Sequence, residues 1–225
     1  WFDLANDQRV NAVILTGAGD YFSVGGDVKA MSSRPGGDFL EEGEAHDPAV
    51  GRRLVNNILE LDKPIIAALN GDAVGLAATV SLFCDITVMS DKARIGDPHV
   101  RVGLVAGDGG AVMWPLLLGM SRAKEFLLRG MLIHGPDAER MGLVNYSVPC
   151  DQVMEKAREI ATELANGATW AIRWTKLSLN SIIKERNVLV QPAAYALEHI
   201  TMEMDDHREA TRAFKEKRKP KFTGR

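Results

Sequence analysis

Short apolar runs alternate with segments of helical periodicity along the first half of the chain. Asn11–Thr16 and Pro64–Leu69 are nearly continuous apolar runs that end at Gly17 and at Asn70-Gly71. Short runs of this kind, bounded by turn residues, are typical of buried strands. Further strand candidates that are shorter or less apolar lie at 86–89, 93–96 and 143–148.

Helical segments occupy most of the remaining sequence. Asp47-Pro48 has the form of an N-cap followed by proline at the first helical position, and predicts a helix that continues to about Leu61. A second helix is expected from Gly75 to near Cys84, and a glycine-rich loop at 103–110 leads into a third. The later helix candidates are 121–129, 136–142, 151–166, 168–184, 190–203 and 206–217.

Strands that alternate with helices, followed mainly by helices, predict an α/β core with a helical C-terminal lobe. We expect the core to cover residues 1–160 and the lobe residues 161–225. The opening Trp1-Phe2-Asp3 resembles the end of a helix that leads into a strand, so part of the core is expected to precede the given sequence. Residues 32–48, rich in Gly, Pro, Asp and Glu, predict a surface loop.

Composition narrows the class of protein only slightly. The 225 residues are 46% hydrophobic and 25% charged, with a formal net charge of −3, which favours neither a nucleic-acid nor a membrane partner. Apolar runs stay below the ~18–20 residues of a membrane helix, and we expect a cytoplasmic protein. Cys84 and Cys150 lie in unrelated contexts, so buried or inert thiols are expected rather than a disulfide framework or a metal site.

Two strand-to-helix junctions, Gly25-Gly26 and Gly75-Leu76, are candidates for chemistry. Backbone N–H groups in the first turn of a helix lack intrahelical partners, and glycine lets them approach a ligand oxygen closely. Two such turns that converge would form an oxyanion hole, where one donor contributes about 10²–10³ in rate. Glycines in this setting also serve as ordinary tight turns, so spacing alone does not decide between the two interpretations.

Six ordered motifs, spread over nearly the whole chain, resemble those of the enoyl-CoA hydratase (crotonase) superfamily. They are FSVGGDVK at 22–29, NGDAVGLAATVSLFCDI at 70–86, ARIGDPH at 93–99, GLVAGDGG at 103–110, AERMGLVN at 138–145 and AFKEKRKPKF at 213–222. The resemblance implies a crotonase-like spiral of ββα units with a helical C-terminal region that drives trimerisation, often as a dimer of trimers. It also implies an acyl-CoA-type substrate and no cofactor or metal beyond the CoA moiety itself.

The resemblance assigns roles to individual positions. The amides of Gly26 and Leu76 match the two oxyanion donors, although relatives usually have glycine at the second position. The leucine keeps the backbone donor and is expected to narrow the pocket. The positions implied to bind substrate or CoA are Asp27, Val28 and Lys29 near the adenine, and Phe214 and Lys217 across a subunit boundary.

The two catalytic glutamates of the hydratases align with Thr79 and His99. Threonine does not exchange a proton near neutral pH, so hydration by two glutamates is not expected, and Thr79 becomes a substrate contact. His99 is followed nine residues later by Asp108, and a carboxylate that orients an imidazole makes a competent general base. This pair is similar to the β-diketone hydrolase branch, typified by 6-oxocamphor hydrolase, which uses a His–Asp dyad for retro-Claisen cleavage of a carbon–carbon bond.

Three functions therefore remain open. The first is an enzyme that stabilises an enolate or oxyanion and performs isomerisation, atypical hydration, or hydrolysis of a C–C or thioester bond. The second is a trimer that binds CoA esters without catalysis, and the third, RNA binding through the basic tail 208–225, ranks last. Residues interpreted as structural or peripheral are His134, His199 and His207 on the surface or in the lobe, Trp170 and Trp174 in the core or at a subunit interface, and His46 as a lesser substrate contact.

Overall fold

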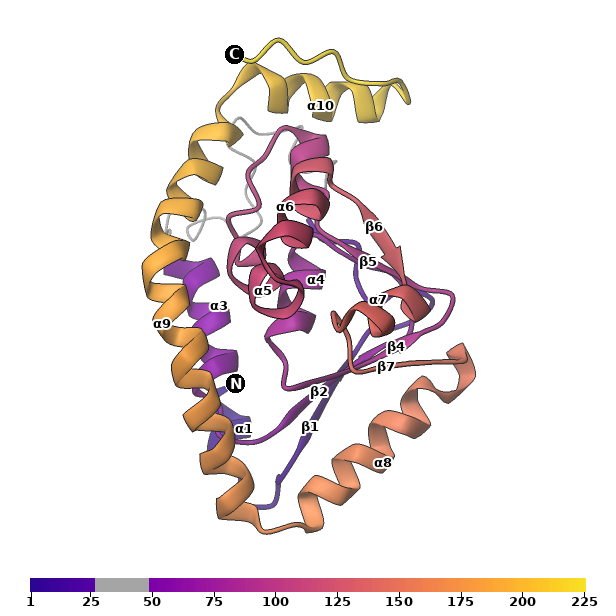
Figure 1. The fold of residues 1–225 in the computed structure, drawn as a ribbon, viewed down its shortest axis with the longest axis vertical. Coiled ribbons are helices and arrows are strands. Elements are labelled where there is room, and N and C mark those ends of the chain that lie inside the picture. The colour runs from indigo at the N-terminus through magenta and orange to yellow at the C-terminus, as the bar shows by residue number, and fades with distance from the viewer. Residues whose placement is uncertain (27–48) are drawn as a thin grey trace.

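The computed structural model describes residues 1–26 and 49–225, and shows an α/β fold (Figure 1). Among these residues, one sheet is parallel throughout, with the order β1-β2-β4-β7. Its strands are β1 (Val13–Thr16), β2 (Ile65–Leu69), β4 (Ile86–Ser90) and β7 (Tyr146–Val148). A smaller sheet has the order β3-β5-β6, from β3 (Ala73–Val74), β5 (Arg94–Gly96) and β6 (Leu132–His134). The predicted strands are thus present, and the predicted run 143–148 is a strand only in its second half.

The helices agree with most of the predicted segments. They are α1 (Phe2–Asn6), α3 (Ala49–Glu60), α4 (Leu76–Phe83), α5 (Gly110–Leu118), α6 (Met120–Arg129), α7 (Gly135–Met141), α8 (Val153–Asn166), α9 (Thr169–Met202) and α10 (Asp205–Lys215). Short 3-10 turns cover His99–Val102 and Cys150–Gln152. The expectation for residues 32–48, including His46, lies outside the described residues.

One prediction about the helices is wrong. The two helices expected at 168–184 and 190–203 form a single helix, α9, that continues through the polar stretch between them. Pro192 lies inside α9, where a proline removes one backbone hydrogen bond. The helix continues because tertiary contacts on both sides of Pro192 hold it, and its buried face includes Asn187 and Ala194.

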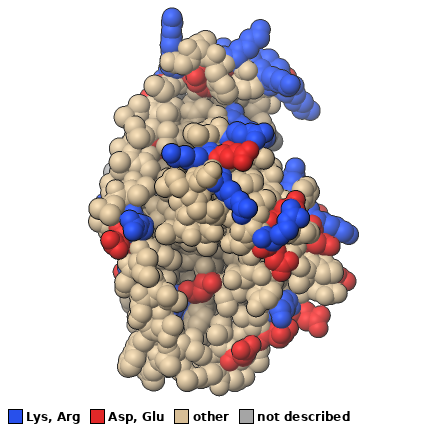
Figure 2. Space-filling model, viewed as in Figure 1, with Lys and Arg blue, Asp and Glu red and all other residues tan. Residues whose placement is uncertain are grey.

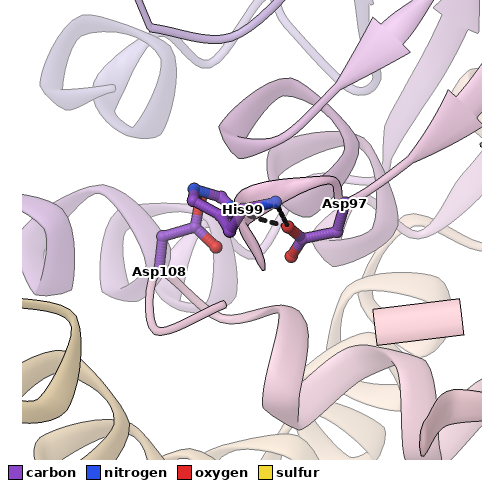
Figure 3. A group of neighbouring side chains, drawn as sticks. All are labelled: Asp97, His99 and Asp108. Atoms are coloured by element: carbon purple, nitrogen blue, oxygen red, sulfur yellow. Dashed lines mark hydrogen bonds and ion pairs between the residues drawn. The ribbon is translucent and has the colours of Figure 1, made fainter. Parts of the chain in front are cut away.

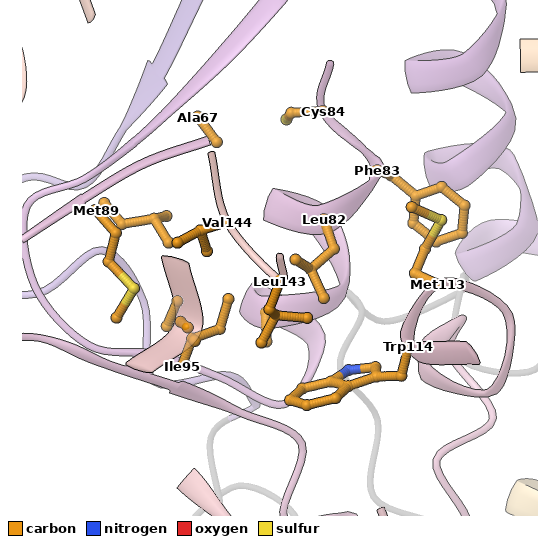
Figure 4. Packing of buried hydrophobic residues seen from close by; sticks show 14 of the residues in the cluster. Ala67, Leu82, Phe83, Cys84, Met89, Ile95, Met113, Trp114, Leu143 and Val144 are labelled. Atoms are coloured by element: carbon orange, nitrogen blue, oxygen red, sulfur yellow. The ribbon is translucent and has the colours of Figure 1, made fainter. Parts of the chain in front are cut away.

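Both faces of the parallel sheet are buried at β2, which explains why this strand is continuously apolar. Ile65 and Leu69 of β2 belong to the larger hydrophobic cluster, part of which Figure 4 shows around Trp114, whereas Ile66 faces the opposite side. On that side α8 packs its Val153, Ala157 and Ile160 against the sheet. The helix α8 continues across residue 160, and the predicted division of the chain at that position stays a prediction.

The structure narrows several peripheral expectations. Trp170 and Trp174 are 56% and 61% exposed, so in the isolated chain they do not belong to the core. His207 is buried, and its Nδ1 pairs with the carbonyl oxygen of Val102 at 2.7 Å, which ties α10 to the turn after His99. Cys150 is exposed, while burial raises the pKa of Cys84 to about 12 and makes that thiol unreactive. None of the helices in the described part of the chain is long and apolar enough to cross a membrane.

Candidate active site

The two glycine turns lie against each other. Ser23 forms an isolated parallel bridge with Ala73, and the amide of Val74 donates to the carbonyl of Ser23 at 3.1 Å. Gly25 has φ +82°, and a Cβ at this position would lie 2.7 Å from the Val74 carbonyl oxygen and 3.8 Å from the Leu76 nitrogen. The turn before Gly26 therefore reaches the first residue of α4, as convergence of two oxyanion donors requires. Asp27, Val28 and Lys29 lie outside the described residues, so their predicted contacts stay predictions.

His99 stands beside the second turn. It begins the 3-10 turn that follows β5, and a Cβ at Gly75 would lie 3.6 Å from Cε1 of the His99 ring. Gly75 has φ +62° and places the amide of Leu76 at the first position of α4. The imidazole thus lies beside the turn that carries the second predicted oxyanion donor.

Asp97, rather than Asp108, holds the Nδ1 side of the His99 ring. Asp97 is 1% exposed, and its Oδ1 forms a short hydrogen bond with Nδ1 of His99 (Figure 3). The same oxygen accepts from the backbone N–H of His99 at 3.3 Å. A carboxylate at Nδ1 keeps the proton on that nitrogen and leaves Nε2 as the atom available for chemistry.

Two further carboxyl groups flank Nε2 of His99. Asp108 Oδ2 and Glu198 Oε1 each lie 3.7 Å from this nitrogen. The predicted partners His99 and Asp108 are therefore close together, but the distance between these two atoms is longer than a hydrogen bond. Thr79 is completely buried and donates its hydroxyl to Asp108 Oδ1 at 2.9 Å, so it orients Asp108, and its predicted substrate contact stays a prediction. We name His99, Asp97, Asp108 and Glu198 the His99 cluster.

Burial and the neighbouring negative charges have opposite effects on the pKa of His99. Burial lowers the pKa of His99, but the negative charges of Asp108, Asp97 and Glu198 outweigh it and raise that pKa to about 10. Burial, and then repulsion from Asp108, raises the pKa of Glu198 to about 8. Burial likewise raises the pKa of Asp108, against the attraction of His99. Near neutral pH the cluster therefore holds protons on both His99 and Glu198.

The glycines of the GDGG loop make room for this cluster. A Cβ on Gly107 would lie 2.7 Å from Oε2 of Glu198 and 2.5 Å from the carbonyl oxygen of Ala194. A Cβ on Gly110 would collide with Oδ2 of Asp97. Glycines, which have no side chain, therefore occupy the points of the loop where the carboxyl groups of two distant segments approach its backbone.

Three carboxyl oxygens of the cluster have no hydrogen-bond partner within residues 1–26 and 49–225, although they are buried. They are Asp97 Oδ2, Asp108 Oδ2 and Glu198 Oε2. Unpaired buried acceptors are rare in folded proteins, and they mark places where a water molecule or a polar substrate group would be held. Donor atoms of Asp97, His99 and Asp108 also lie within 4.8 Å of one another, so these residues could hold a cation, and the expectation of no metal stays a prediction.

Sequence reasoning missed Asp97 and Glu198. Asp97 lies within the ARIGDPH motif, two residues before His99, and this short spacing is the signal that could have indicated it. Glu198 is 99 residues beyond His99 in sequence, and the signal for it was an acidic residue on the buried face of an amphipathic helix. Only the packing of α9 on the GDGG loop makes that position part of the site.

The residues implied to meet CoA across a subunit boundary lie at the far end of α10. Phe214 is 56% exposed, and Lys217 follows the helix end at Glu216. Figure 2 shows Lys and Arg side chains gathered at the end of the molecule where α10 lies. Within the basic tail, Arg218 is paired with Glu209 and Glu216, so part of its charge is already compensated. The predicted CoA contacts of Phe214 and Lys217 stay predictions.

The chain is similar to known proteins in both sequence and structure. The enoyl-CoA hydratase/isomerase family model matches residues 2–225. A putative enoyl-CoA hydratase from Thermus thermophilus is 36% identical over 223 residues, which are 98% of this chain and 86% of that protein. A crystal structure of an enoyl-CoA hydratase/isomerase from Mycobacterium paratuberculosis superposes with a TM-score of 0.86 at 30% identity, covering 94% of this chain and 83% of the other.

A third similar protein differs from these in its reaction. It is a β-diketone hydrolase from the cyanobacterium Anabaena, whose structure holds (S)-3-oxocyclohexyl acetic acid. It superposes with a TM-score of 0.79 at 30% identity, and the match covers 90% of this chain and 79% of the hydrolase chain. The predicted fold is thus confirmed at the level of the superfamily.

Proposed function

Because the chain belongs to the enoyl-CoA hydratase/isomerase family, we propose that it is an enzyme that acts on an acyl-CoA-type carbonyl compound through the His99 cluster. The observation that carries this proposal is the position of His99 beside the Gly75-Leu76 turn, with a carboxyl group near each ring nitrogen. The substrate carbonyl oxygen would accept from the amides of Gly26 and Leu76. Charge that develops on this oxygen would be stabilised by donors already in place.

In this proposal the His99 cluster transfers the proton. With its pKa raised to about 10, His99 is protonated near neutral pH and can donate from Nε2 to an enolate carbon. When Asp108 takes up a proton, it no longer stabilises the imidazolium, so the ring can release its proton and then accept one from the substrate. The charges of His99, Asp108 and Glu198 therefore shift one another's pKa values, which supports isomerisation or hydrolysis better than hydration by two glutamates.

A second candidate is hydrolysis of a carbon–carbon bond in a β-dicarbonyl compound. It is favoured by the replacement of both hydratase glutamates with Thr79 and His99, together with the similarity to a β-diketone hydrolase. Water would add to one carbonyl carbon while its proton passes to the cluster. The C–C bond would then break, its electron pair would form an enolate held by the two amides, and the cluster would return the proton to carbon.

A trimer that only binds CoA esters is a weaker explanation of the site. Several buried carboxyl groups around one imidazole are costly to maintain, and a protein that only binds a thioester gains nothing from a cluster whose pKa values are shifted this far. We retain assembly into a homotrimer or a dimer of trimers as part of the proposal, with Phe214 and Lys217 at the boundary between subunits.

The test is mass-spectrometric analysis after incubation with enoyl-, β-keto- and β-diketo-acyl-CoA thioesters and with free cyclic diketones. We expect one class to be converted, and His99→Ala to lower its turnover by about 10²–10⁴-fold. His134→Ala, which changes an exposed histidine on β6, is the matched control and should retain activity. A cleaved β-dicarbonyl product would select C–C hydrolysis, whereas full turnover by His99→Ala would exclude this histidine as the proton carrier.

A further inference from the structure

The buried face of α9 carries two side-chain amides with atoms that have no hydrogen-bond partner in the described part of the chain. Asn187 and Gln191 are 4% and 2% exposed, and they lie one helical turn apart. The atoms without a hydrogen-bond partner are Oδ1 of Asn187 and both Oε1 and Nε2 of Gln191. Each unpaired buried polar group costs about 1–3 kcal/mol, so such groups persist where a bound molecule supplies what the protein does not.

Two other polar residues on the same helix face are paired. Asn180 donates to the carbonyl of Leu59 at 3.0 Å, and Lys176 donates to the carbonyl of Lys63 at 2.8 Å and pairs with Asp85. The core therefore satisfies Lys176 and Asn180 on this face of α9. The unpaired atoms of Asn187 and Gln191 lie between these paired residues and Glu198, whose Oε2 is also unpaired.

This turn lies on the same face of α9 as Glu198. Positions 187, 191 and 198 are separated by four and seven residues, a spacing that places them on one side of a helix. At 1.5 Å per residue, Gln191 lies about 10 Å along the axis from Glu198, whose carboxyl group flanks His99. Helix α9 runs beside α3 (Figure 1) and also contacts α5, and Asn187 and Gln191 lie on its buried face.

We propose that Asn187 and Gln191 form a subsite for a neutral hydrogen-bonding group, a hydroxyl or a second carbonyl, carried by the acyl part of the substrate. This inference rests on the proposed function, because it takes the His99 cluster as the reacting end. Gln191 offers a donor and an acceptor, and Asn187 an acceptor, which together suit a group that is neutral and polar. An acyl carboxylate fits less well, because it would add a negative charge to an interior that already contains Asp97, Asp108 and Glu198.

Binding measurements on matched ligands test the subsite. Isothermal titration calorimetry would compare hexanoyl-, octanoyl- and decanoyl-CoA with their ω-hydroxy and ω-oxo derivatives. At one chain length the wild-type protein should bind the derivative at least about 10-fold more tightly than the plain thioester. Gln191→Met, which keeps the size of the side chain and removes its hydrogen bonds, should abolish this preference without weakening the plain thioester. Equal affinities at every length, or equal weakening of both ligands by Gln191→Met, would overturn the subsite.

A second measurement tests the subsite even if no thioester binds. Absence of thioester binding would by itself count against the proposed function. Asn187→Leu and Asn180→Leu are the same substitution on the same helix face, one at an unpaired and one at a paired amide. A binding role predicts that Asn187→Leu keeps or raises Tm in the free protein, while Asn180→Leu lowers it. Equal loss of Tm in both variants would show that Asn187 serves the fold, and would refute the proposal.

Discussion

The contact between Asp97 and Nδ1 determines which nitrogen of His99 faces the reaction. Because the charge of Asp97 and its hydrogen bond both raise the pKa of His99, Asp97→Asn should lower that pKa. It should also allow the ring to adopt the wrong tautomer, and turnover should fall by about 10²–10⁴-fold. NMR titration of the histidine resonances, read beside the pH profile of turnover, measures both effects. Asp137→Asn, at an exposed carboxylate on α7, is the control, and an unchanged pKa of His99 in Asp97→Asn would contradict this assignment.

For individual residues of the site, the sequence predicted those that lie in a recognised motif and did not indicate the others. His99 and Asp108 were predicted from their place in the ARIGDPH and GLVAGDGG motifs, and the structure brings them to within 3.7 Å. Glu198 could not be predicted, because its role depends on α9 packing against Gly107, and no local pattern encodes a contact between segments this far apart. Thr79 was assigned by alignment to the substrate, yet its hydroxyl is used to hold Asp108.

Among the elements, short apolar strands and helices with clear starts were predicted well, and α9 was not. Two helices were expected at 168–184 and 190–203, but burial of one face of α9 across the residues between them outweighs the local signal. The strands β3 and β6 were missed because two or three residues are too few to show a period.

The continuity of α9 has a measurable consequence at Pro192. If the helix continues through this residue, Pro192→Ala supplies a missing backbone donor and removes a steric clash, and should raise the free energy of unfolding by about 1–3 kcal/mol. If the chain breaks there, the proline would instead restrain a turn, and its removal would lower stability. Denaturation by urea distinguishes the two. Pro149→Ala, at the residue that precedes the turn Cys150–Gln152, is the matched control and should cost about 0.4–1 kcal/mol.

For the molecule as a whole, the buried protons of the His99 cluster predict how stability depends on pH. The pKa of His99 is about 10 in the folded protein and 6.5 ordinarily, and that of Glu198 is about 8 against 4.5. Both are raised on folding, so between these values the folded state binds more protons than the unfolded state, and stability falls as pH rises. The contribution of Glu198 is complete below about pH 4.5 and lost through pH 8, and that of His99 is complete below about pH 6.5 and lost through pH 10.

Urea denaturation across this range should therefore give a free energy of unfolding that is larger near pH 6 than near pH 9. Glu198→Gln removes one of the two groups, so the slope should become shallower between about pH 5 and pH 8 while the decline at higher pH remains. His199→Gln changes the next residue of α9, which is exposed, and should leave the whole profile unchanged. Stability that is constant or rises over this range would mean that the cluster holds a cation or ordered water in place of the protons, because either would compensate the buried carboxylates without taking up protons as the chain folds.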